Sequence, residues 1–265
     1  MNVIKLNNLS FTYARQKYSA GFKLSIDNFV VSEGEFTSII GPNGCGKSTL
    51  LKLIAGLLTP AAGSIEVYGK TSGKTNLNNY AKLISYVPQM SYSVFPFSVY
   101  EIVMMGRTPY LNLLGFEKQA DVTAVKDSLA KLEIEHLAMK GINEISGGEA
   151  QRVFIARALA QDAKIILLDE PNAHLDIEHQ ITIFELLKKL NNDETKTILT
   201  VSHDLNLVGI YSNRVVIMEN GSVEFDGDKK QILNREIIKN CFRVDADVLS
   251  GIDNSLNVLI NPVKK

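Results

Sequence analysis

One short glycine-rich stretch has the residue types and the spacing needed to bind a phosphate. Residues Gly41-Pro42-Asn43-Gly44-Cys45-Gly46-Lys47-Ser48-Thr49 fit the pattern G-x-x-x-x-G-K-[ST]. Glycines let backbone N–H groups surround a phosphate, and the start of a following helix adds a favourable dipole. Lys47 would then reach the β- and γ-phosphates of a nucleotide, and the Ser48 hydroxyl would hold Mg²⁺.

The segments on either side of this loop are those that a phosphate loop requires. Residues 35–40 are an apolar run typical of a buried strand, and residues 48–58 predict a helix. The apolar stripe of that helix consists of Leu50, Leu51, Ile54 and Leu58. An ordinary strand-to-helix turn with an exposed lysine is the alternative, but two correct flanking elements favour the phosphate loop.

Polar residues also follow the ends of three other predicted strands. Asp169 and Glu170 end an apolar run at residues 165–168, Gln89 follows a strand at 84–88, and His203 follows a strand at 197–202. Ligands of open α/β sheets gather at such carboxyl ends. Asp169 is suited to hold Mg²⁺, and Glu170, on the other side by strand alternation, is available to orient or deprotonate water. Taken alone, each could be an ordinary solvated or structural residue.

Ser146, Gly147, Gly148 and Glu149 precede a helix predicted over residues 151–160. Ser146 and Glu149 have the spacing of a capping box, which would explain both residues structurally. Two glycines in a first helical turn cost about 1 kcal/mol each, which suggests that another backbone or an anion approaches closely. Asp176 is a suitable N-cap for a helix at residues 177–190.

Composition limits the kind of protein that this chain can be. With 265 residues, 45% of them hydrophobic and 22% charged, it can form one large α/β core or a core with an inserted lobe. A net charge of -1 implies no general attraction to nucleic acid. The sequence predicts no membrane span, signal peptide, disulfide framework or zinc site, so we expect a cytoplasmic chain that reaches a membrane only through a partner.

The segment from about residue 90 to 160 differs from its surroundings because it is predominantly helical. Its apolar residues exceed what a solvated lobe needs, which favours a partner-binding surface over a small core of the lobe's own. These residues are Val94, Phe95, Val99, Met104, Met105 and Tyr110. Tyr13, after the first predicted strand, could equally stack on a nucleobase or pack in the protein.

Taken together, these motifs resemble the ATP-binding cassette (ABC) family of transport ATPases over nearly the whole chain. In chain order they correspond to the Walker A loop at 41–49, the Q-loop at Gln89, the signature motif at Ser146-Gly147-Gly148, the Walker B strand at 165–170, the D-loop at Leu175-Asp176 and the switch histidine at His203. Tyr13 matches the family's adenine-stacking aromatic residue. Several motifs in this order are specific, whereas any one alone is not.

The resemblance implies an α/β fold. We expect a phosphate-loop NTPase core with a mainly parallel sheet, an N-terminal antiparallel β subdomain and an inserted helical subdomain. The core with the β subdomain would occupy residues 1–89 and 161–227, the helical subdomain about 90–160, and a C-terminal extension 228–265, all within one nucleotide-binding domain.

The resemblance also implies roles for individual residues, with ATP and Mg²⁺ as ligands. Glu170, His203, Lys47 and Gln89 would be catalytic, while Ser48, Gln89 and Asp169 would bind the metal. The nucleotide would contact Tyr13, residues 41–49, Gln89, residues 146–149 and Asp176. We further expect the Cys45 thiol, at a helix N-terminus beside Lys47, to have a lowered pKa, so that alkylation inactivates the protein and ATP protects it.

The family implies a head-to-tail homodimer in which the signature motif of one chain closes over ATP held by the other. The stretch Thr108-Pro109-Tyr110, after Met105-Gly106-Arg107, is similar to cassettes that serve the uptake of iron-siderophores, haem, vitamin B12 and, in some cases, molybdate. This resemblance implies a membrane permease that contacts Phe95 to Tyr110 and a substrate-binding protein outside the cytoplasm. It also implies a peripheral location on the cytoplasmic face of the inner membrane. A soluble cassette that remodels ribosomes or nucleic acid is the alternative, but this chain has neither two cassettes nor a basic surface. The intact Glu170 and His203 argue against a module that does not hydrolyse ATP.

Overall fold

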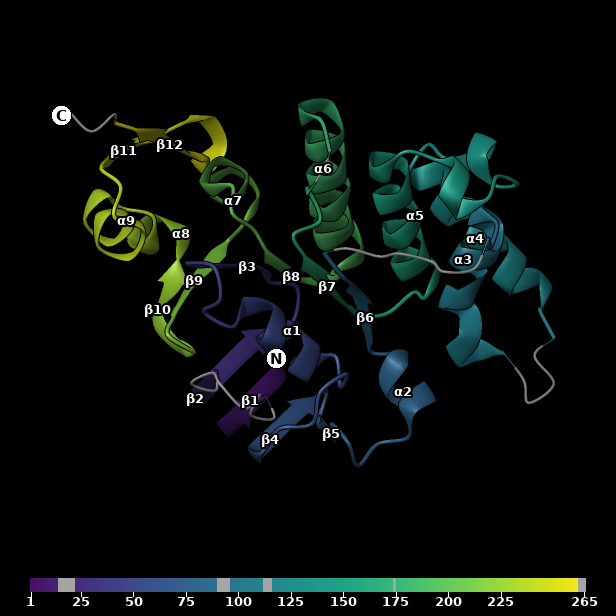
Figure 1. Ribbon diagram of the computed structural model, residues 1–265, viewed down its shortest axis with the longest axis horizontal. Helices are drawn as coiled ribbons and strands as arrows, with labels where there is room; N and C mark the ends of the chain where they lie inside the picture. The colour runs from purple at the N-terminus through teal and green to yellow at the C-terminus, as the bar shows by residue number, and fades with distance from the viewer. Residues whose placement is uncertain (14–21, 90–95, 112–115, 174, 262–265) are drawn as a thin grey trace.

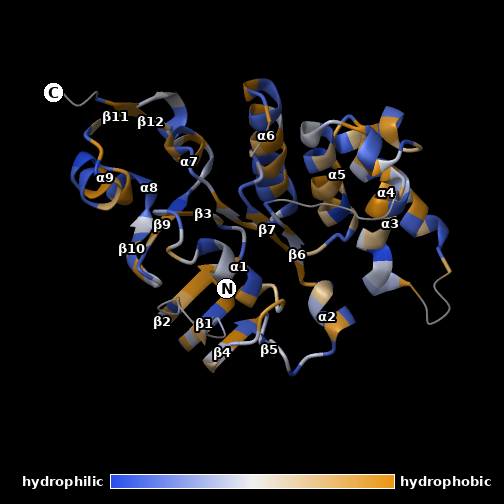
Figure 2. Cartoon of the chain, viewed as in Figure 1, coloured by the Kyte–Doolittle hydropathy of each residue, from blue (hydrophilic) through white to orange (hydrophobic). Residues whose placement is uncertain are grey.

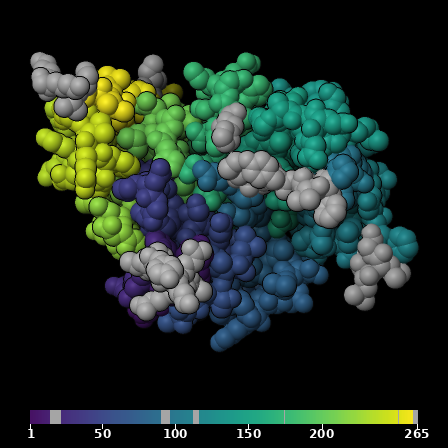
Figure 3. Space-filling view, in the orientation of Figure 1, coloured from purple at the N-terminus to yellow at the C-terminus, as the bar shows by residue number. Residues whose placement is uncertain are grey.

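The computed structural model describes residues 1–13, 22–89, 96–111, 116–173 and 175–261. Two large sheets lie at its centre, with a group of helices on one side and a C-terminal segment on the other (Figure 1). In the space-filling view the teal helical segments and the yellow C-terminal segments lie at opposite ends of the molecule (Figure 3). No helix among the described residues is long and apolar enough to cross a bilayer.

The first sheet is antiparallel and is built mainly from the N-terminal part of the chain. Its order is β2-β1-β4-β5. The strands are β1 (Asn2–Thr12), β2 (Lys23–Ser32), β4 (Ala62–Val67) and β5 (Lys70–Thr71). β2 is one continuous strand, because Asn28 pairs with Asn7 in the ladder and the polar pair at residues 27–28 does not interrupt it.

The second sheet carries the ends of the strands that the sequence singled out. Its order is β10-β9-β3-β8-β7-β6, and all neighbouring pairs are parallel except β9 with β10. The strands are β3 (Phe36–Ile40), β6 (Ile84–Val87), β7 (Ile165–Asp169), β8 (Thr197–Val201), β9 (Arg214–Glu219) and β10 (Ser222–Asp228). The expected mainly parallel sheet is therefore confirmed, and the carboxyl ends of β3, β8, β7 and β6 meet at one edge.

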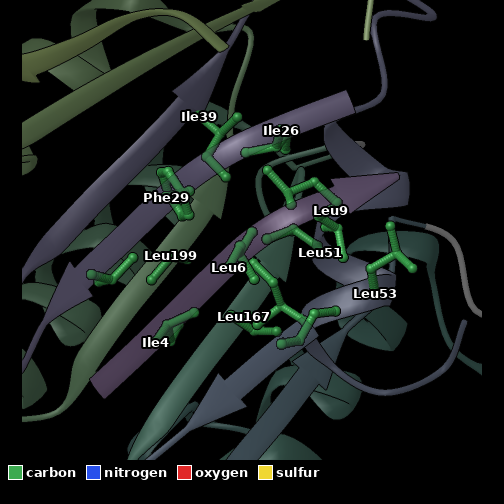
Figure 4. Close-up of a cluster of buried hydrophobic side chains, with 14 of the residues drawn as sticks. Ile4, Leu6, Leu9, Ile26, Phe29, Ile39, Leu51, Leu53, Leu167 and Leu199 are labelled. Carbon is green, nitrogen blue, oxygen red and sulfur yellow. The ribbon is translucent and has the colours of Figure 1, made fainter. Parts of the chain in front are cut away.

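Alternation along the central strands divides the core between two faces. Leu167 and Leu199 pack toward the first sheet and α1, together with Leu6 and Leu51 (Figure 4). The residues that alternate with them along β7 and β8, among them Leu168, pack toward the helical group. Strands that are buried on both faces read as largely apolar runs, and residues 165–168 of β7 are all isoleucine or leucine. The centre of the molecule around the β7 label accordingly shows much orange (Figure 2).

The helices cover the sheets and build the insertion between β6 and β7. They are α1 (Lys47–Ile54), α2 (Leu77–Ala81), α3 (Val99–Met104), α4 (Gln119–Lys131), α5 (Gly147–Ala160), α6 (Ile177–Glu194), α7 (Leu205–Tyr211), α8 (Lys229–Ile232) and α9 (Arg235–Phe242), with 3₁₀ turns such as η1 (Met105–Tyr110). The predicted helical insertion is present in the described part of the chain.

Several predicted boundaries were wrong. The first helix ends at Ile54, not at Leu58, because Gly56 takes a φ of 73° and turns the chain before Pro60. A helix is expected from about Gln119 to Leu137, but α4 ends at Lys131 because Glu133, with a φ of 57°, leaves the helical conformation. Residues 71–79, predicted as a loop, contain the start of α2, whose N-terminus is capped by the Asn76 side chain.

A buried ion pair and a close backbone approach fix the insertion to α5. The Arg107 guanidinium donates to Asp121 Oδ1 at 2.9 Å and to the Ala160 carbonyl at 2.7 Å. A Cβ at Gly106 would collide with the Arg157 carbonyl oxygen, so only glycine lets η1 lie this close to α5. The lobe therefore has a rigid connection to the helix that begins at the signature motif.

The C-terminal segment is more structured than the sequence predicted. One helix was predicted near residues 232–241, but the chain forms two short helices, α8 and α9. The weak strand expected at residues 258–260 is β12 (Leu256–Ile260), and it pairs with β11 (Ala246–Ser250), which the sequence analysis did not identify. Leu256 of this hairpin and Val208 of α7 belong to one cluster of buried apolar side chains.

Candidate active site

The phosphate loop connects β3 to α1 at the carboxyl edge of the central sheet. Gly41 has a φ of 145°, and a Cβ there would collide with the Met218 carbonyl oxygen, so the first glycine of the motif is required by backbone packing. The Lys47 ammonium lies over the loop and donates to the carbonyl oxygens of Gly41 at 2.8 Å and Pro42 at 2.9 Å. Lys47 is thus held across the space that the loop encloses.

Ser48 and Asp169 are brought together from α1 and β7. The Ser48 hydroxyl donates to Asp169 Oδ1 at 2.8 Å, and the Tyr86 phenol donates to Asp169 Oδ2 at 3.2 Å. Burial raises the pKa of Asp169, and these two hydrogen bonds only partly oppose it. Burial and the neighbouring Asp169 in turn raise the pKa of Tyr86, so its phenol remains a donor at neutral pH.

Glu170 lies directly after β7 in a strained conformation between two other predicted site residues. Its φ is 50°, in the left-handed region that costs about 1–3 kcal/mol for a residue other than glycine. Gln89 Nε2 donates to Glu170 Oε2 at 2.6 Å, and His203 Nε2 lies 2.8 Å from Glu170 Oε1. Because a carboxylate oxygen only accepts, His203 donates through Nε2. Both oxygens of Glu170 are therefore oriented by side chains from the ends of β6 and β8.

A pocket of about 620 Å³ lies over this edge of the sheet. Tyr13 lines one end of it, with its phenol 3.1 Å from Thr49 Oγ1 and its ring edge-to-face with Phe11. The other lining residues are Phe22, Asn43, Gly44, Gly46, Lys47, Ser48, Thr49, Gln89, Glu170 and His203. The pocket thus combines an exposed aromatic ring, the phosphate loop and the Glu170 cluster. This combination has the shape and chemistry that a nucleoside triphosphate requires.

The oxygen donors of this pocket fit a magnesium ion. Mg²⁺ is usually bound by one or two protein oxygens together with phosphate oxygens and water. The Ser48 hydroxyl and the Asp169 carboxylate are paired at 2.8 Å, and Gln89 lines the same pocket as Ser48. The chemistry of these three residues fits the ion, and their role as its ligands stays a prediction.

The expectation of a lowered pKa for Cys45 was wrong. Its thiol is 3.9 Å from the Lys47 ammonium, which lowers the pKa, but Cys45 is only 4% exposed and burial raises the pKa by more. The thiol packs in the same buried apolar cluster as Leu6 and Leu51. Cys45 also lines a second pocket of about 710 Å³, together with Cys241. Burial in an apolar environment thus outweighs the nearby positive charge.

The signature residues and Asp176 lie apart from the pocket. Ser146 accepts from the Glu149 amide at 3.3 Å, and Glu149 Oε2 accepts from the Ser146 amide at 2.7 Å, which confirms the predicted capping box. Asp176 caps α6 and accepts from His179 Nδ1 at 2.7 Å. None of these residues belongs to the described lining of the nucleotide-sized pocket.

Two residues of the site were missed from the sequence. Tyr86 lies in the strand predicted at residues 84–88, but the sequence analysis gave it no role. By strand alternation its side chain lies on the same face of that strand as those of residues 84 and 88. Phe22, which lines the pocket beside Tyr13, was considered only as part of a strand. The rings of Tyr13 and Phe22 meet only in the tertiary structure, and the sequence carried no local signal for the pair.

The fold and the pocket together define a phosphate-loop ATPase with an inserted helical lobe. A model of the ABC transporter family matches residues 24–173. The iron(3+)-hydroxamate import ATP-binding protein FhuC of Bacillus subtilis (strain 168) is 35% identical over 223 residues, which are 84% of this chain and 83% of FhuC. The chain therefore belongs to the ABC transporter family.

Two solved structures extend the comparison to the fold. One, described as a metal-chelate type ABC transporter in an inward-facing conformation, matches with a TM-score of 0.83 and 31% identity over 100% of this chain and 99% of that chain. The other is a dimeric post-hydrolysis state of the ATP-binding cassette MJ0796 bound to ADP and Pi, with a TM-score of 0.74 and 30% identity over 85% of this chain and 98% of that one. Both likenesses support the α/β fold described above.

Proposed function

We propose that this chain is the ATP-hydrolysing subunit of a membrane importer, and that it couples ATP binding and hydrolysis to the uptake of a metal chelate such as an iron-siderophore complex. The observation that carries the hydrolytic part is the convergence of Ser48, Asp169, Glu170, Gln89 and His203 on one pocket. The substrate class is supported by the likeness to FhuC and to a structure described as a metal-chelate type transporter. Neither comparison favours ribosome or nucleic-acid remodelling.

Within the pocket, each side chain has a distinct task in ATP hydrolysis. The phosphate loop and Lys47 hold the β- and γ-phosphates, and the Tyr13 ring stacks on the adenine. Glu170 orients and deprotonates the attacking water, and His203 and Gln89 keep its carboxylate aimed at that water. Ser48, Asp169 and Gln89 would hold Mg²⁺, and the bound ion would offset phosphate charge.

We propose that the complete catalytic site forms between two copies of the chain. Ser146 and Gly147 are exposed at the start of α5, and a Cβ on Gly147 would meet no atom within 4 Å. The exposed glycine has no packing partner of its own among the described residues, which supports an approach by the phosphates held in a partner copy. The resulting head-to-tail homodimer would contain two ATP sites, with Glu149 and Asp176 beside them.

The helical lobe is the proposed contact for the membrane permease. Met105 is 41% exposed and Tyr110 is partly buried, which leaves some apolar surface on the described part of residues 95–110. Val99 and Met104, which the sequence analysis expected on this surface, are instead buried in the apolar core, and Val94 lies outside the described residues. Phe95 lies outside the described residues. A permease helix docked here would hold the chain at the cytoplasmic face of the inner membrane, while a substrate-binding protein outside delivers the chelate.

The decisive experiment is co-purification of the tagged chain from detergent-solubilised membranes. The Glu170→Gln variant with ATP would hold the closed dimer, and the same variant without nucleotide is the control. Recovery of a multispanning permease, with more of it in the presence of ATP, is the expected result. A chain that dimerises with ATP but recovers ribosomes or nucleic acid, and no membrane protein, would contradict the proposal.

A further inference from the structure

We propose that Tyr86 is a positioning residue of the ATPase site: its phenol fixes the Asp169 carboxylate in the orientation that serves the metal. The inference rests on the magnesium site proposed above. It concerns a residue with no motif assignment, three positions before Gln89 on β6.

The register of the central sheet places Tyr86 beside Asp169. In the parallel pair of β6 and β7, Tyr86 lies opposite Leu167. Asp169 is two residues further along β7, so its side chain is on the same face as those of Leu167 and Tyr86. That face packs against α1, which supplies Ser48. The tyrosine, the aspartate and the serine therefore meet at one point between two strands and a helix.

The two oxygens of Asp169 have different donors, and together these donors determine the plane of the carboxylate. Ser48 donates to Oδ1 at 2.8 Å and Tyr86 donates to Oδ2 at 3.2 Å. A carboxylate held at one oxygen can still rotate about its terminal bond, whereas donors at both oxygens prevent that rotation. Asp169 is only 2% exposed, so water offers little replacement for a lost donor.

The same two strand ends also carry the link that orients Glu170. Gln89 follows β6 and donates to Glu170, which follows β7, while Tyr86 and Asp169 make a second link a few residues earlier. The bond between Tyr86 and Asp169 lies on the proposed metal side, and the bond between Gln89 and Glu170 lies on the proposed water side. Tyr86 thus ties the proposed metal residue to β6, as Gln89 ties the proposed water-orienting residue to the end of the same strand.

Magnesium-dependent nucleotide binding tests this role without relying on turnover. The affinity of a fluorescent ATP analogue is titrated in EDTA and at increasing Mg²⁺, using Tyr86→Phe in the non-hydrolysing Glu170→Gln background. We expect equal affinity in EDTA and a rise of about tenfold in the Mg²⁺ concentration needed for half-maximal enhancement, the size expected for one hydrogen bond to a charged group. In the Glu170-intact protein, Tyr86→Phe should require more Mg²⁺ for half-maximal turnover while KM for ATP at saturating Mg²⁺ stays close to wild type.

Tyr80→Phe is the matched control, because the Tyr80 phenol is also buried and donates to the Ile54 carbonyl at 2.8 Å, away from the metal residues. It should leave the Mg²⁺ dependence unchanged. A Tyr86→Phe protein with wild-type Mg²⁺ dependence, or one that loses affinity equally in EDTA, would overturn the positioning role. If Asp169→Asn also leaves the Mg²⁺ dependence unchanged, the proposed magnesium site itself is wrong.

Discussion

Asp169 and Glu170 are adjacent acids with opposite environments, and this difference separates their proposed tasks. Asp169 ends β7 in regular strand conformation, is 2% exposed and accepts from two hydroxyls. Glu170 has a φ of 50° and is oriented by an amide and an imidazole. One carboxylate is thereby held beside the phosphate loop, and the other is turned toward the space where water would attack.

Replacing Glu170 with glutamine should separate chemistry from binding. The amide keeps the size of the side chain but cannot take a proton, so turnover should fall by about 10²–10⁴-fold, as for other general bases. ATP affinity, measured with a fluorescent analogue, should remain within about twofold of wild type. A large loss of nucleotide affinity in a folded variant would show that Glu170 serves the structure of the pocket instead.

Cys45 should react slowly with thiol reagents at neutral pH. Burial raises its pKa despite the neighbouring Lys47, so little thiolate is present and the sulfur is poorly accessible. The rate of alkylation by iodoacetamide at pH 7 should be below that of a free cysteine, and should rise when denaturant unfolds the chain. Mass spectrometry of the peptide that contains Cys45 measures this rate; modification as fast as that of free cysteine would refute it.

At the scale of elements, the insertion is held to α5 by a buried ion pair. Arg107 contacts both Asp121 of α4 and the last turn of α5, and its guanidinium lies 4.0 Å from the centre of the Tyr110 ring. Lys82 lies over the same ring at 5.1 Å. The lobe is therefore connected to the core beside β6 as well as to the helix of the signature motif, which is a rigid route between the proposed permease contact and the ATP site.

Asp121→Asn should destabilise the fold and change its dependence on pH. Removing one charge from a buried pair leaves the other uncompensated, at a cost of about 3 kcal/mol. Burial alone raises the pKa of Asp121, but hydrogen bonds from the Lys118 amide and Arg107 outweigh it and hold the pKa below its usual value. This contribution to stability is present above the unfolded pKa of about 4 and is lost as pH falls below it.

Urea unfolding from pH 7 down to pH 3 measures this effect. The difference in unfolding free energy between wild type and Asp121→Asn should be largest at neutral pH and should shrink below about pH 4. Glu178 in the first turn of α6 provides the control, because Glu178→Gln removes an exposed carboxylate that is not part of a buried ion pair. A difference that is constant with pH would contradict the role assigned to the ion pair.

At the scale of the whole molecule, the ATP pocket and the signature motif lie on different parts of one chain. The pocket is formed by the loop before α1 and by the ends of the central strands, whereas Ser146 starts α5 and is not part of its lining. In the proposed dimer, each chain contributes its pocket to one site and its Ser146 to the other. In the proposed cycle, ATP changes the distance between two copies of the chain, and the helical lobes transmit this movement to a permease.

Gly147→Ala tests the dimer without disturbing the monomer. A Cβ at this position meets nothing within 4 Å, and alanine in a helix is more stable than glycine by up to about 1 kcal/mol. We expect an unchanged or raised melting temperature and unchanged ATP binding by the monomer. Turnover, measured in the Glu170-intact protein, should fall at least about tenfold, and so should ATP-dependent dimerisation, measured by light scattering in the Glu170→Gln background. Full activity with normal dimerisation would place the signature motif outside the catalytic site.

The residue sequence alone determined the chemistry of the site and the class of fold. The phosphate loop, the acids at the end of β7, Gln89 and His203 could be predicted because local patterns mark strand ends, and parallel strands bring their carboxyl ends to one edge. The capping box at Ser146 was likewise local and is confirmed. The Asn220-Gly221 turn between β9 and β10, with φ of 49° and 83°, follows the same kind of local signal.

Only the tertiary structure decided what depends on packing between distant segments. The pKa of Cys45 follows from its burial in the core, which a reading of its sequence neighbours could not include. The bond between Tyr86 and Asp169 depends on the register of β6 against β7. The β11–β12 hairpin forms because Leu256 and Val258 bury their side chains against other elements, although the segment has weak strand character by itself. Local patterns thus specify which residues can do chemistry, and long-range packing specifies which of them meet.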